Sequence, residues 1–441
     1  MKRGCFFGWL LFLVAGFAAW GQEGGAGLGQ PSPLSLDTAL TPAALWETPP
    51  QAFVEDHKLL GFRWNSTAQD SAQTTLRGIT LFEIPVPQAI VRVRNGAIRQ
   101  ATVYFYNRGD SGEITQKDFE TLIRNVVAAF SRVTGVKLED RGRDAASAVR
   151  AHGLAGESEN ASYLLEYSFT RASRGEPFRG EFVRLEISPK KEKGTLREEV
   201  AQEQEPAAPF RGRDHVVQDQ ATGQVVIKDI PMVDQGQKGY CVVASAERVL
   251  RYYGVRVDSH ELAQLANSSA EEGTSVAAMT ESLKKLTARL RVRTRTQIDF
   301  EYRDFIKLME SYNRQAKRAD KSPVAAPGAV FDLKEVYAQM DPDVLRATRT
   351  RSKGELTRFM GLVKSNVDKG VPLLWSVMLG VIPEPMVPQS AGGHMRLIIG
   401  YNEKTEELLY SDSWGMGHEL KKMPVADAWS ITTGLSTLEP L

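Results

Sequence analysis

The sequence predicts an α+β protein with two domains, and three observations support this prediction. Two runs of alternating apolar residues flank Asn95-Gly96, a dipeptide that favours the tight turn of a β-hairpin. Residues 116–133 carry apolar side chains at helical spacing. Charged and polar residues dominate residues 189–224, which indicates a linker. We therefore expect an α+β accessory domain at residues 51–188 and a second domain at residues 225–441.

The elements of the first domain follow from local signals along the chain. Residues 22–50 are rich in Gly, Pro and Ala without clear periodicity, and we expect a flexible lead-in there. Thr115 can cap the predicted helix, and Gly135 can end it. The strands expected in this domain cover residues 89–94, 97–106, 162–170 and 181–187.

Three roles are open for the first domain: an inhibitory pro-region, a module that binds substrate or the cell envelope, and a plain structural partner. A charged linker could be cut in an exported zymogen, which fits a pro-region. The predicted strands favour a binding or accessory module.

Size and charge exclude some classes of function. A chain of 441 residues with 42% hydrophobic and 25% charged residues is typical of a soluble globular protein. The formal net charge of +1 gives no electrostatic reason to expect nucleic acid or an anionic membrane as a partner. Beyond the first apolar run, no stretch approaches the roughly 18 apolar residues of a transmembrane helix. The sequence does not indicate an oligomeric state.

The N-terminus has the pattern of a secretory signal peptide over residues 1–21. A positive start precedes an apolar run from Phe6 to Ala19 that is too short to span a bilayer, and small residues precede a cleavage site after Gly21. Cys5 precedes the apolar run, which argues against a lipoprotein. We expect an exported protein, periplasmic or extracellular, without stable membrane insertion after cleavage.

Removal of this signal would leave Cys241 as the sole cysteine, because the chain contains only two. A single thiol in an exported protein cannot form an internal disulfide and suggests a reactive or intermolecular cysteine. Cys241 also begins a predicted helix, residues 241–253, which Gly254 ends. Free backbone NH groups at a helix N-terminus stabilise a thiolate, so the position favours a nucleophile.

The run Gln235-Gly236-Gln237-Lys238-Gly239-Tyr240-Cys241 resembles the active-site loop of papain-like cysteine peptidases. Lys238 stands where many members have a disulfide-forming cysteine, and Val242 replaces an aromatic residue, so the chain is more similar to the bacterial bacteriocin-leader-peptidase-like (double-glycine peptidase-like) branch. The resemblance implies a central helix that carries the cysteine, packed on an antiparallel sheet that carries a histidine and its orienting residue. It also implies an oxyanion hole made by the Gln235 amide and the Cys241 backbone NH.

His394 is the expected base. It lies 153 positions after Cys241 (394 minus 241), close to the roughly 130 to 150 of papain-type sequences. Gly392-Gly393 precedes it, and residues 395–401 read as a buried strand. The other histidines of the mature chain lack this context; they are His57, His152, His215, His260 and His418.

Asp412 is the expected orienting residue. Positions 394 and 412 are symmetric about residue 403, in the middle of a polar turn, so a hairpin would place them directly opposite, with Cβ atoms about 5 Å apart. Asp412-Ser413-Trp414-Gly415 also resembles the Asn-Ser-Trp-Gly of the family, which implies that Asp412 orients His394 and that Trp414 shields their contact. A carboxylate would raise the pKa of the histidine and favour a thiolate-imidazolium pair.

The rest of the second domain is predicted in less detail. Alternating arginines at 291, 293 and 295 mark one solvated strand face, with an acidic-substrate groove as the alternative. Three prolines within residues 381–391 predict a loop beside His394 that shapes the substrate cleft. Further helices are expected at residues 259–266, 275–286 and 355–368, and strands at 225–227, 291–295 and 372–378.

Together, these residues predict an exported cysteine peptidase with the catalytic set Cys241, His394, Asp412 and Gln235, acting on peptide or protein substrates. Two alternatives stay open: a transglutaminase-like acyltransferase, and a catalytically silent peptide-binding protein on a peptidase scaffold. The sequence contains no His/Cys cluster, metalloprotease motif, EF-hand or phosphate loop, so neither a metal nor a cofactor is expected.

Overall fold

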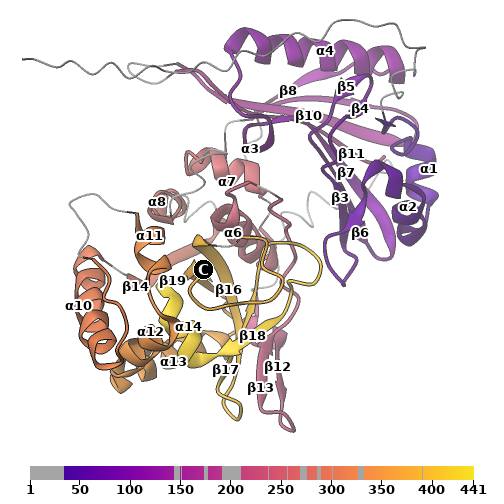
Figure 1. Cartoon of the computed structure of the whole chain (residues 1–441). Coiled ribbons are helices and arrows are strands. Elements are labelled where there is room, and N and C mark those ends of the chain that lie inside the picture. The colour runs from indigo at the N-terminus through magenta and orange to yellow at the C-terminus, as the bar shows by residue number, and fades with distance from the viewer. Residues whose placement is uncertain are drawn as a thin grey trace, which may run out of the picture. The chain divides into compact units, whose positions relative to one another are not determined.

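The structure, a computed structural model, is described from Leu34 onward (Figure 1). The described residues are 34–143, 149, 151–172, 177–190, 210–236, 238–255, 257–268, 276–285, 290–299, 301–325, 332–389 and 391–441. The predicted signal peptide and its cleavage site lie outside them. No helix in these ranges is long and apolar enough to cross a membrane.

The protein is a mixed α+β structure, as predicted. In the part before residue 190, eight described strands form one antiparallel sheet in the order β2-β3-β6-β7-β11-β10-β9-β8. Their bounds are β2 (Arg63–Trp64), β3 (Ser71–Thr74), β6 (Gln88–Arg94), β7 (Ala97–Asn107), β8 (Glu139–Arg143), β9 (His152–Glu157), β10 (Ala161–Thr170) and β11 (Arg179–Pro189). The long helix α4 (Gln116–Thr134) packs Phe119, Val126 and Phe130 into the same apolar core as the sheet.

The local signals in this part are confirmed. Asn95 and Gly96 have positive φ angles of 52° and 72° in the turn between β6 and β7, as a type I′ hairpin turn requires. The Thr115 hydroxyl caps α4 by accepting the backbone NH of Asp118, and Gly135 ends the helix in the left-handed region at φ 70°.

The predicted flexible lead-in is wrong from Leu34 onward. The segment folds as β1 (Leu34–Ser35), α1 (Pro42–Glu47) and the start of α2 (Pro50–Asp56), and its three buried leucines at 36, 40 and 45 join the core. Proline begins both helices, at a position where the missing NH costs no hydrogen bond. The Pro-rich composition therefore marked helix starts instead of a linker. The remaining short elements are η1 (Lys58–Leu60), β4 (Ile79–Leu81), β5 (Ile84–Pro85) and α3 (Arg108–Ser111).

The part from Phe210 onward is built on a second antiparallel sheet. Its order is β12-β13-β16-β15-β19-β14, and β17 and β18 extend from β16. The bounds are β12 (Val216–Asp219), β13 (Gln224–Ile227), β14 (Val292–Asp299), β15 (Leu373–Leu379), β16 (Gly392–Asn402), β17 (Glu407–Ser411), β18 (Lys421–Pro424) and β19 (Thr432–Pro440).

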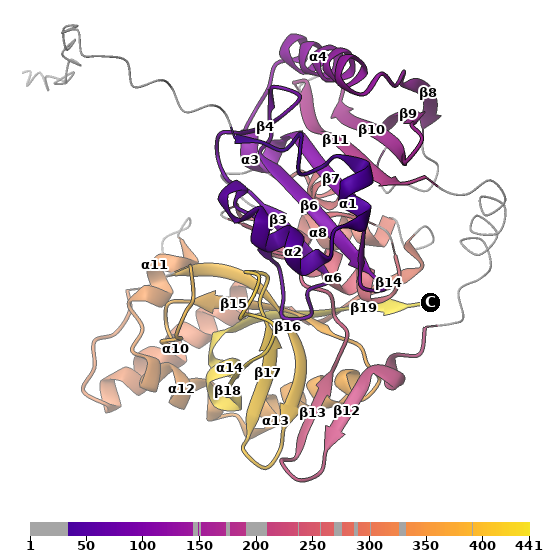
Figure 2. The same ribbon diagram turned by 90° about the vertical axis from the view of Figure 1, so that its right-hand side faces the viewer.

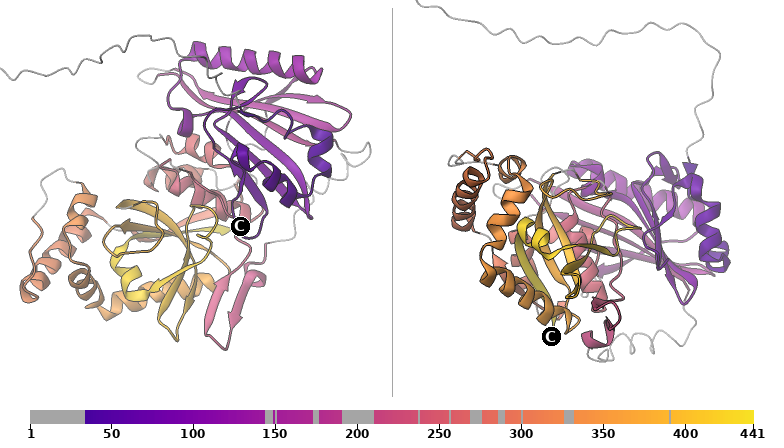
Figure 3. Two further views of the ribbon diagram at one scale, coloured as in Figure 1. Left: turned by 45° about the vertical axis from the view of Figure 1, so that its right-hand side comes forward. Right: turned by 60° about the horizontal axis from the view of Figure 1, so that its bottom comes forward.

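Helices cover both faces of this sheet (Figures 2 and 3). Leu374 faces the core formed with α6 to α8, whereas its neighbours Leu373 and Trp375 face the core formed with α10 to α14. This alternation is what a strand buried on both sides requires. The helices are η2 (Gly212–His215), α6 (Cys241–Tyr252), α7 (Ser259–Leu265), α8 (Val276–Lys285), α10 (Tyr302–Arg318), α11 (Leu333–Ala338), α12 (Pro342–Thr350), α13 (Lys353–Val367) and α14 (Val425–Ile431).

Part of the predicted linker, residues 189–224, folds as regular structure. Within the predicted linker, residues 191–209 lie outside the described residues, but β12 pairs with β13 and belongs to the second sheet. Asp219, whose carboxylate accepts the NH groups of Ala221 and Thr222, and Gly223, at φ 79°, form the turn between these strands. Both parts of the chain fall into one compact unit, so the division into two domains stays a prediction.

Candidate active site

Helix α6 places Cys241 at its first position. The helix is buried along most of its length, and Ser245 donates to the backbone oxygen of Met395 in β16, which ties the helix to the sheet. The thiol is half-buried. Cys241 thus lies at a helix N-terminus and beside β16, as the sequence predicts.

His394 lies in β16 and joins Cys241 to Asp412. Its Nε2 is 2.8 Å from Asp412 Oδ1, and the side chains of both residues are completely buried. The other ring nitrogen, Nδ1, is buried and has no hydrogen-bond partner among the described residues, and His394 is close enough to the Cys241 thiol to lower its pKa. Because Nε2 faces the carboxylate, Nδ1 is the nitrogen available to the sulfur. The Trp414 ring stacks on His394 at 4.2 Å with an interplanar angle of 8°, and so covers the contact.

Electrostatics favour a charged Cys-His pair. Burial alone would raise the pKa of Cys241, but the nearby His394 lowers it, with help from the backbone NH groups of Met395 and Val242. Burial alone would lower the pKa of His394, but its hydrogen bond with Asp412 and the charge of Cys241 raise it. The arrangement therefore stabilises thiolate and imidazolium together.

The contact between His394 and Asp412 forms, but the predicted strand register is wrong. Leu397 pairs with Ser411, so continuing the register one step places Arg396 opposite Asp412. A four-residue turn at 403–406 and an irregularity between Ile398 and Gly400 shift the pairing relative to a symmetric hairpin. His394 reaches Asp412 along the diagonal, a separation that a long ring can bridge.

Arg396 is a site residue that the sequence analysis missed. Its Nε donates to Asp412 Oδ1 at 3.1 Å, the atom that also receives His394, and its guanidinium pairs with Glu384 at 3.0 Å. Arg396 and His394 are two residues apart on one strand and so share a face. A charged residue within a predicted buried strand was the available signal, because a buried charge needs a partner.

A second buried arginine holds the backbone of the site. Arg248 lies in α6, seven residues after Cys241. Its guanidinium donates to the backbone oxygens of Asp412 and Pro231, both at 2.8 Å, and to the Ser411 hydroxyl at 2.6 Å. Burial lowers its pKa to about 10, which still leaves it charged at neutral pH. It thereby fixes the end of β17, from which the carboxylate projects.

Gln235 is connected to the same segment. Its Oε1 accepts the Ser413 hydroxyl at 2.6 Å, its backbone NH donates to the Ser413 oxygen at 2.8 Å, and its Nε2 donates to the Lys238 oxygen at 3.2 Å. An amide nitrogen has two hydrogens, so one stays available to a further acceptor. The structure thus brings Gln235 to the loop of Asp412, and Ser413 orients its amide with the nitrogen away from the hydroxyl.

The other predictions have mixed outcomes. Arg291, Arg293 and Arg295 are exposed around the buried Val292 and Thr294, so they form a solvated strand face as expected. His418, which lacks the sequence context of His394, packs edge-on against Trp414 at 5.7 Å. In the parts of the chain that the structure describes, no group of three His, Cys, Asp or Glu residues could hold a metal ion.

Comparisons with known proteins match the C-terminal part of the chain. Residues 227–437 match the model of the Peptidase_C39 like family. Solved structures that match include xylellain, a cysteine protease from Xylella fastidiosa; the match has 14% identity and a TM-score of 0.27, and covers 53% of this chain and 90% of that one. No curated protein matches the sequence.

Proposed function

Because residues 227–437 belong to the Peptidase_C39 like family, we propose that the chain is a cysteine peptidase that cleaves peptide bonds with Cys241, His394 and Asp412. One observation carries the proposal: the buried His394 ring contacts Asp412 at 2.8 Å, keeps its Nδ1 unpaired among the described residues, and is close enough to Cys241 to lower the pKa of the thiol. This is the nucleophile, base and orienting group of a catalytic triad.

The first half of the reaction forms a thioester. The Cys241 thiolate attacks the peptide carbonyl carbon, and the carbonyl oxygen becomes an oxyanion that accepts hydrogen bonds from the Gln235 amide and the Cys241 backbone NH. Removing one such donor commonly costs about 3 kcal/mol of transition-state stabilisation. Protonated His394 then gives its proton to the amine as the carbon–nitrogen bond breaks.

The second half releases the acid. Neutral His394 takes a proton from water, which attacks the thioester, and the carbon–sulfur bond breaks to restore the thiolate and imidazolium. Trp414, stacked on the imidazole, limits access of water to the buried contact between His394 and Asp412. Asp412 holds the ring in place through both steps.

The test measures the alkylation of Cys241 by iodoacetamide against pH, followed by mass spectrometry, in the wild type and in His394→Ala. We expect rapid labelling below pH 7 that slows in the variant, because the histidine lowers the pKa of the thiol. Labelling that rises only near pH 8.5, equally in both proteins, would show an ordinary thiol and sink the proposal.

Two alternatives have distinct outcomes in companion assays. A transglutaminase-like acyltransferase would incorporate a labelled amine without net hydrolysis. A silent peptide-binding protein would keep its function in Cys241→Ala and lose it only when the N-terminal part is removed. The shared family supports hydrolysis over both, because its name and the effect of His394 on the pKa of the Cys241 thiol point to the same chemistry.

Export is a further part of the proposal. The positive start, short apolar run and small residues of residues 1–21 support a signal peptide cleaved after Gly21. N-terminal sequencing of the protein recovered from the periplasm or medium of an expressing bacterium should then begin at Gln22. Recovery of the full-length chain from the cytoplasm alone would contradict export.

A further inference from the structure

The loop that precedes Cys241 contacts the part of the chain before residue 190. Lys238 donates to Asp110 of α3 at 2.6 Å, and the exposed fractions of the two side chains are 6% and 24%. Burial alone would raise the pKa of Asp110, but the charge of Lys238 lowers it. The backbone oxygen of Lys238 accepts the Gln235 amide at 3.2 Å. Lys238 therefore connects Asp110 to the proposed oxyanion donor.

Close packing accompanies this ion pair. A Cβ atom added to Gly109 would lie 2.6 Å from Cζ and Oη of Tyr240 and 2.9 Å from Cδ of Lys238. Tyr240 is 1% exposed and immediately precedes Cys241, and Lys238 Nζ lies 5.1 Å from the centre of its ring. Only glycine leaves room for this arrangement, so α3 and the active-site loop fit each other closely.

Two further contacts join the same regions. Arg63 donates to Asp234 at 3.0 Å, at the start of the active-site loop, and the Thr67 backbone NH donates to Glu419 at 2.7 Å, in the loop that follows Asp412. Both loops that carry site residues are therefore held by the segment from 63 to 110.

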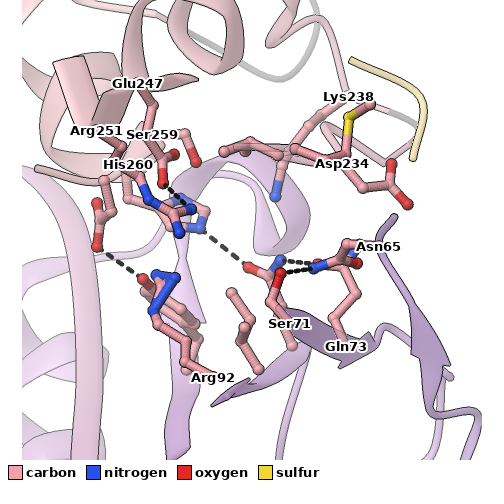
Figure 4. A pocket seen from close by; sticks show the side chains of 16 residues that line it. Asn65, Ser71, Gln73, Arg92, Asp234, Lys238, Glu247, Arg251, Ser259 and His260 are labelled. Atoms are coloured by element: carbon pink, nitrogen blue, oxygen red, sulfur yellow. Dashed lines mark hydrogen bonds and ion pairs between the residues drawn. The ribbon is translucent and has the colours of Figure 1, made fainter. Parts of the chain in front are cut away.

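Many of the side chains that line the contact near this loop are polar. A cavity of about 20 Å³ lies between the two regions, large enough for about one water molecule (Figure 4). Figure 4 shows Lys238 and Asp234 of the loop lining one pocket together with His260 of α7, Asn65 and Gln73. A polar contact of this kind transmits position through a few directed hydrogen bonds, so single substitutions can test it.

We propose that Asp110 is a positioning residue of the active-site loop, which sets the Gln235 amide through Lys238 and so completes the oxyanion hole. This inference rests on the proposed function. Without the carboxylate, the buried ammonium of Lys238 has lost its charge partner, and the loop moves to return it to water. That movement displaces the Lys238 carbonyl and the amide it holds. The N-terminal part is then a component of the catalytic unit, and its removal lowers activity instead of releasing it.

The experiment compares two reactions of the same sulfur in the full chain. Acylation by p-nitrophenyl acetate needs the oxyanion hole, because the thiolate adds to a carbonyl before p-nitrophenolate leaves. Alkylation by iodoacetamide displaces iodide and forms no oxyanion. Cys241→Ala gives the background of each reaction. Asp118→Asn is the matched control, since it makes the same charge change at an exposed position of the N-terminal part.

We expect Asp110→Asn and Lys238→Gln each to slow acylation about tenfold, part of the 10²- to 10³-fold loss on removing a donor outright. Alkylation should stay within about twofold of the wild type, because the helix N-terminus and His394 are untouched. The double variant should be no slower than the slower single variant, since both substitutions break one link. Asp118→Asn should match the wild type in both reactions.

Several outcomes would overturn the inference. Equal losses in acylation and alkylation would indicate general loss of structure, and multiplied losses in the double variant would separate Asp110 from Lys238. If Asp110→Asn does not fold, Gly109→Ala tests the same contact by pressing a methyl group on Tyr240, and unchanged acylation there would refute it. An unactivated thiol in the wild type would instead remove the proposed function and the inference with it.

Discussion

Replacing Asp412 with Asn tests whether its charge, and not only its hydrogen bond, acts on His394. The substitution keeps an acceptor oxygen near Nε2, where Asp412 now lies at 2.8 Å, but removes the negative charge. That charge raises the pKa of His394, so its loss should lower the pKa. An opposite charge at this range shifts a pKa by about 1 to 3 units.

A neighbouring positive charge weakens the effect of Asp412 on His394. Arg396 Nε donates to the same carboxylate oxygen at 3.1 Å and partly offsets its charge. We therefore expect the pKa of His394 to fall, but by less than the loss of an isolated opposite charge would cause. As pH rises, His394 then loses its proton at a lower pH than in the wild type. The pH range in which the ion pair with Cys241 exists therefore ends earlier on the alkaline side.

The assay is the pH dependence of acylation by p-nitrophenyl acetate, with Asp320→Asn as the control. Asp320 is exposed and has a φ angle of 57°, a conformation that Asn also adopts, so the control makes the same charge change without strain. The alkaline limb should move towards acid in Asp412→Asn and stay in place in Asp320→Asn. An unmoved alkaline limb in a folded Asp412→Asn protein would refute the electrostatic reasoning.

Two other substitutions probe orientation and packing. Ser413→Ala removes the hydroxyl that donates to Gln235 at 2.6 Å. Because one hydrogen bond is lost, acylation should slow by up to about tenfold, while alkylation of Cys241 stays unchanged. A parallel fall in the rate of alkylation would contradict this. Trp375→Ala removes a completely buried ring whose indole NH donates to Thr432 at 2.9 Å. Urea unfolding should show that the free energy of unfolding falls by about 3 to 5 kcal/mol. A fall of less than about 1 kcal/mol would contradict this and would mean that the core repacks to fill the space.

The sequence predicted the elements that depend on local rules. Asn95-Gly96 specified its hairpin because few other residues adopt two consecutive left-handed conformations. Thr115 and Gly135 marked the ends of α4 because each satisfies backbone groups that the helix leaves unpaired. Gln235 and Cys241 were predicted from their resemblance to a known active-site loop. No local rule of secondary structure connects either residue to Asp412.

Two other features were not predicted correctly, for different physical reasons. Helix α10 was not predicted, yet Phe305, Leu308, Met309, Tyr312 and Ala316 are buried at clear helical spacing. The register of β16 and β17 was predicted wrongly for a different reason. An irregularity within β16 shifts the pairing, and such an irregularity is set by packing against neighbouring strands instead of by the turn.

Three consecutive side chains, at 412 to 414, serve both halves of the proposed chemistry: Asp412 contacts the base, Ser413 the oxyanion donor, and Trp414 covers the imidazole. The two halves therefore depend on the position of one backbone segment. An insertion or deletion in this tripeptide would misalign acid-base catalysis and oxyanion binding at once. A relative that keeps the cysteine but lacks Gln235 and Ser413 would have no amide oriented in this way, so the pair indicates an oxyanion hole better than the cysteine alone.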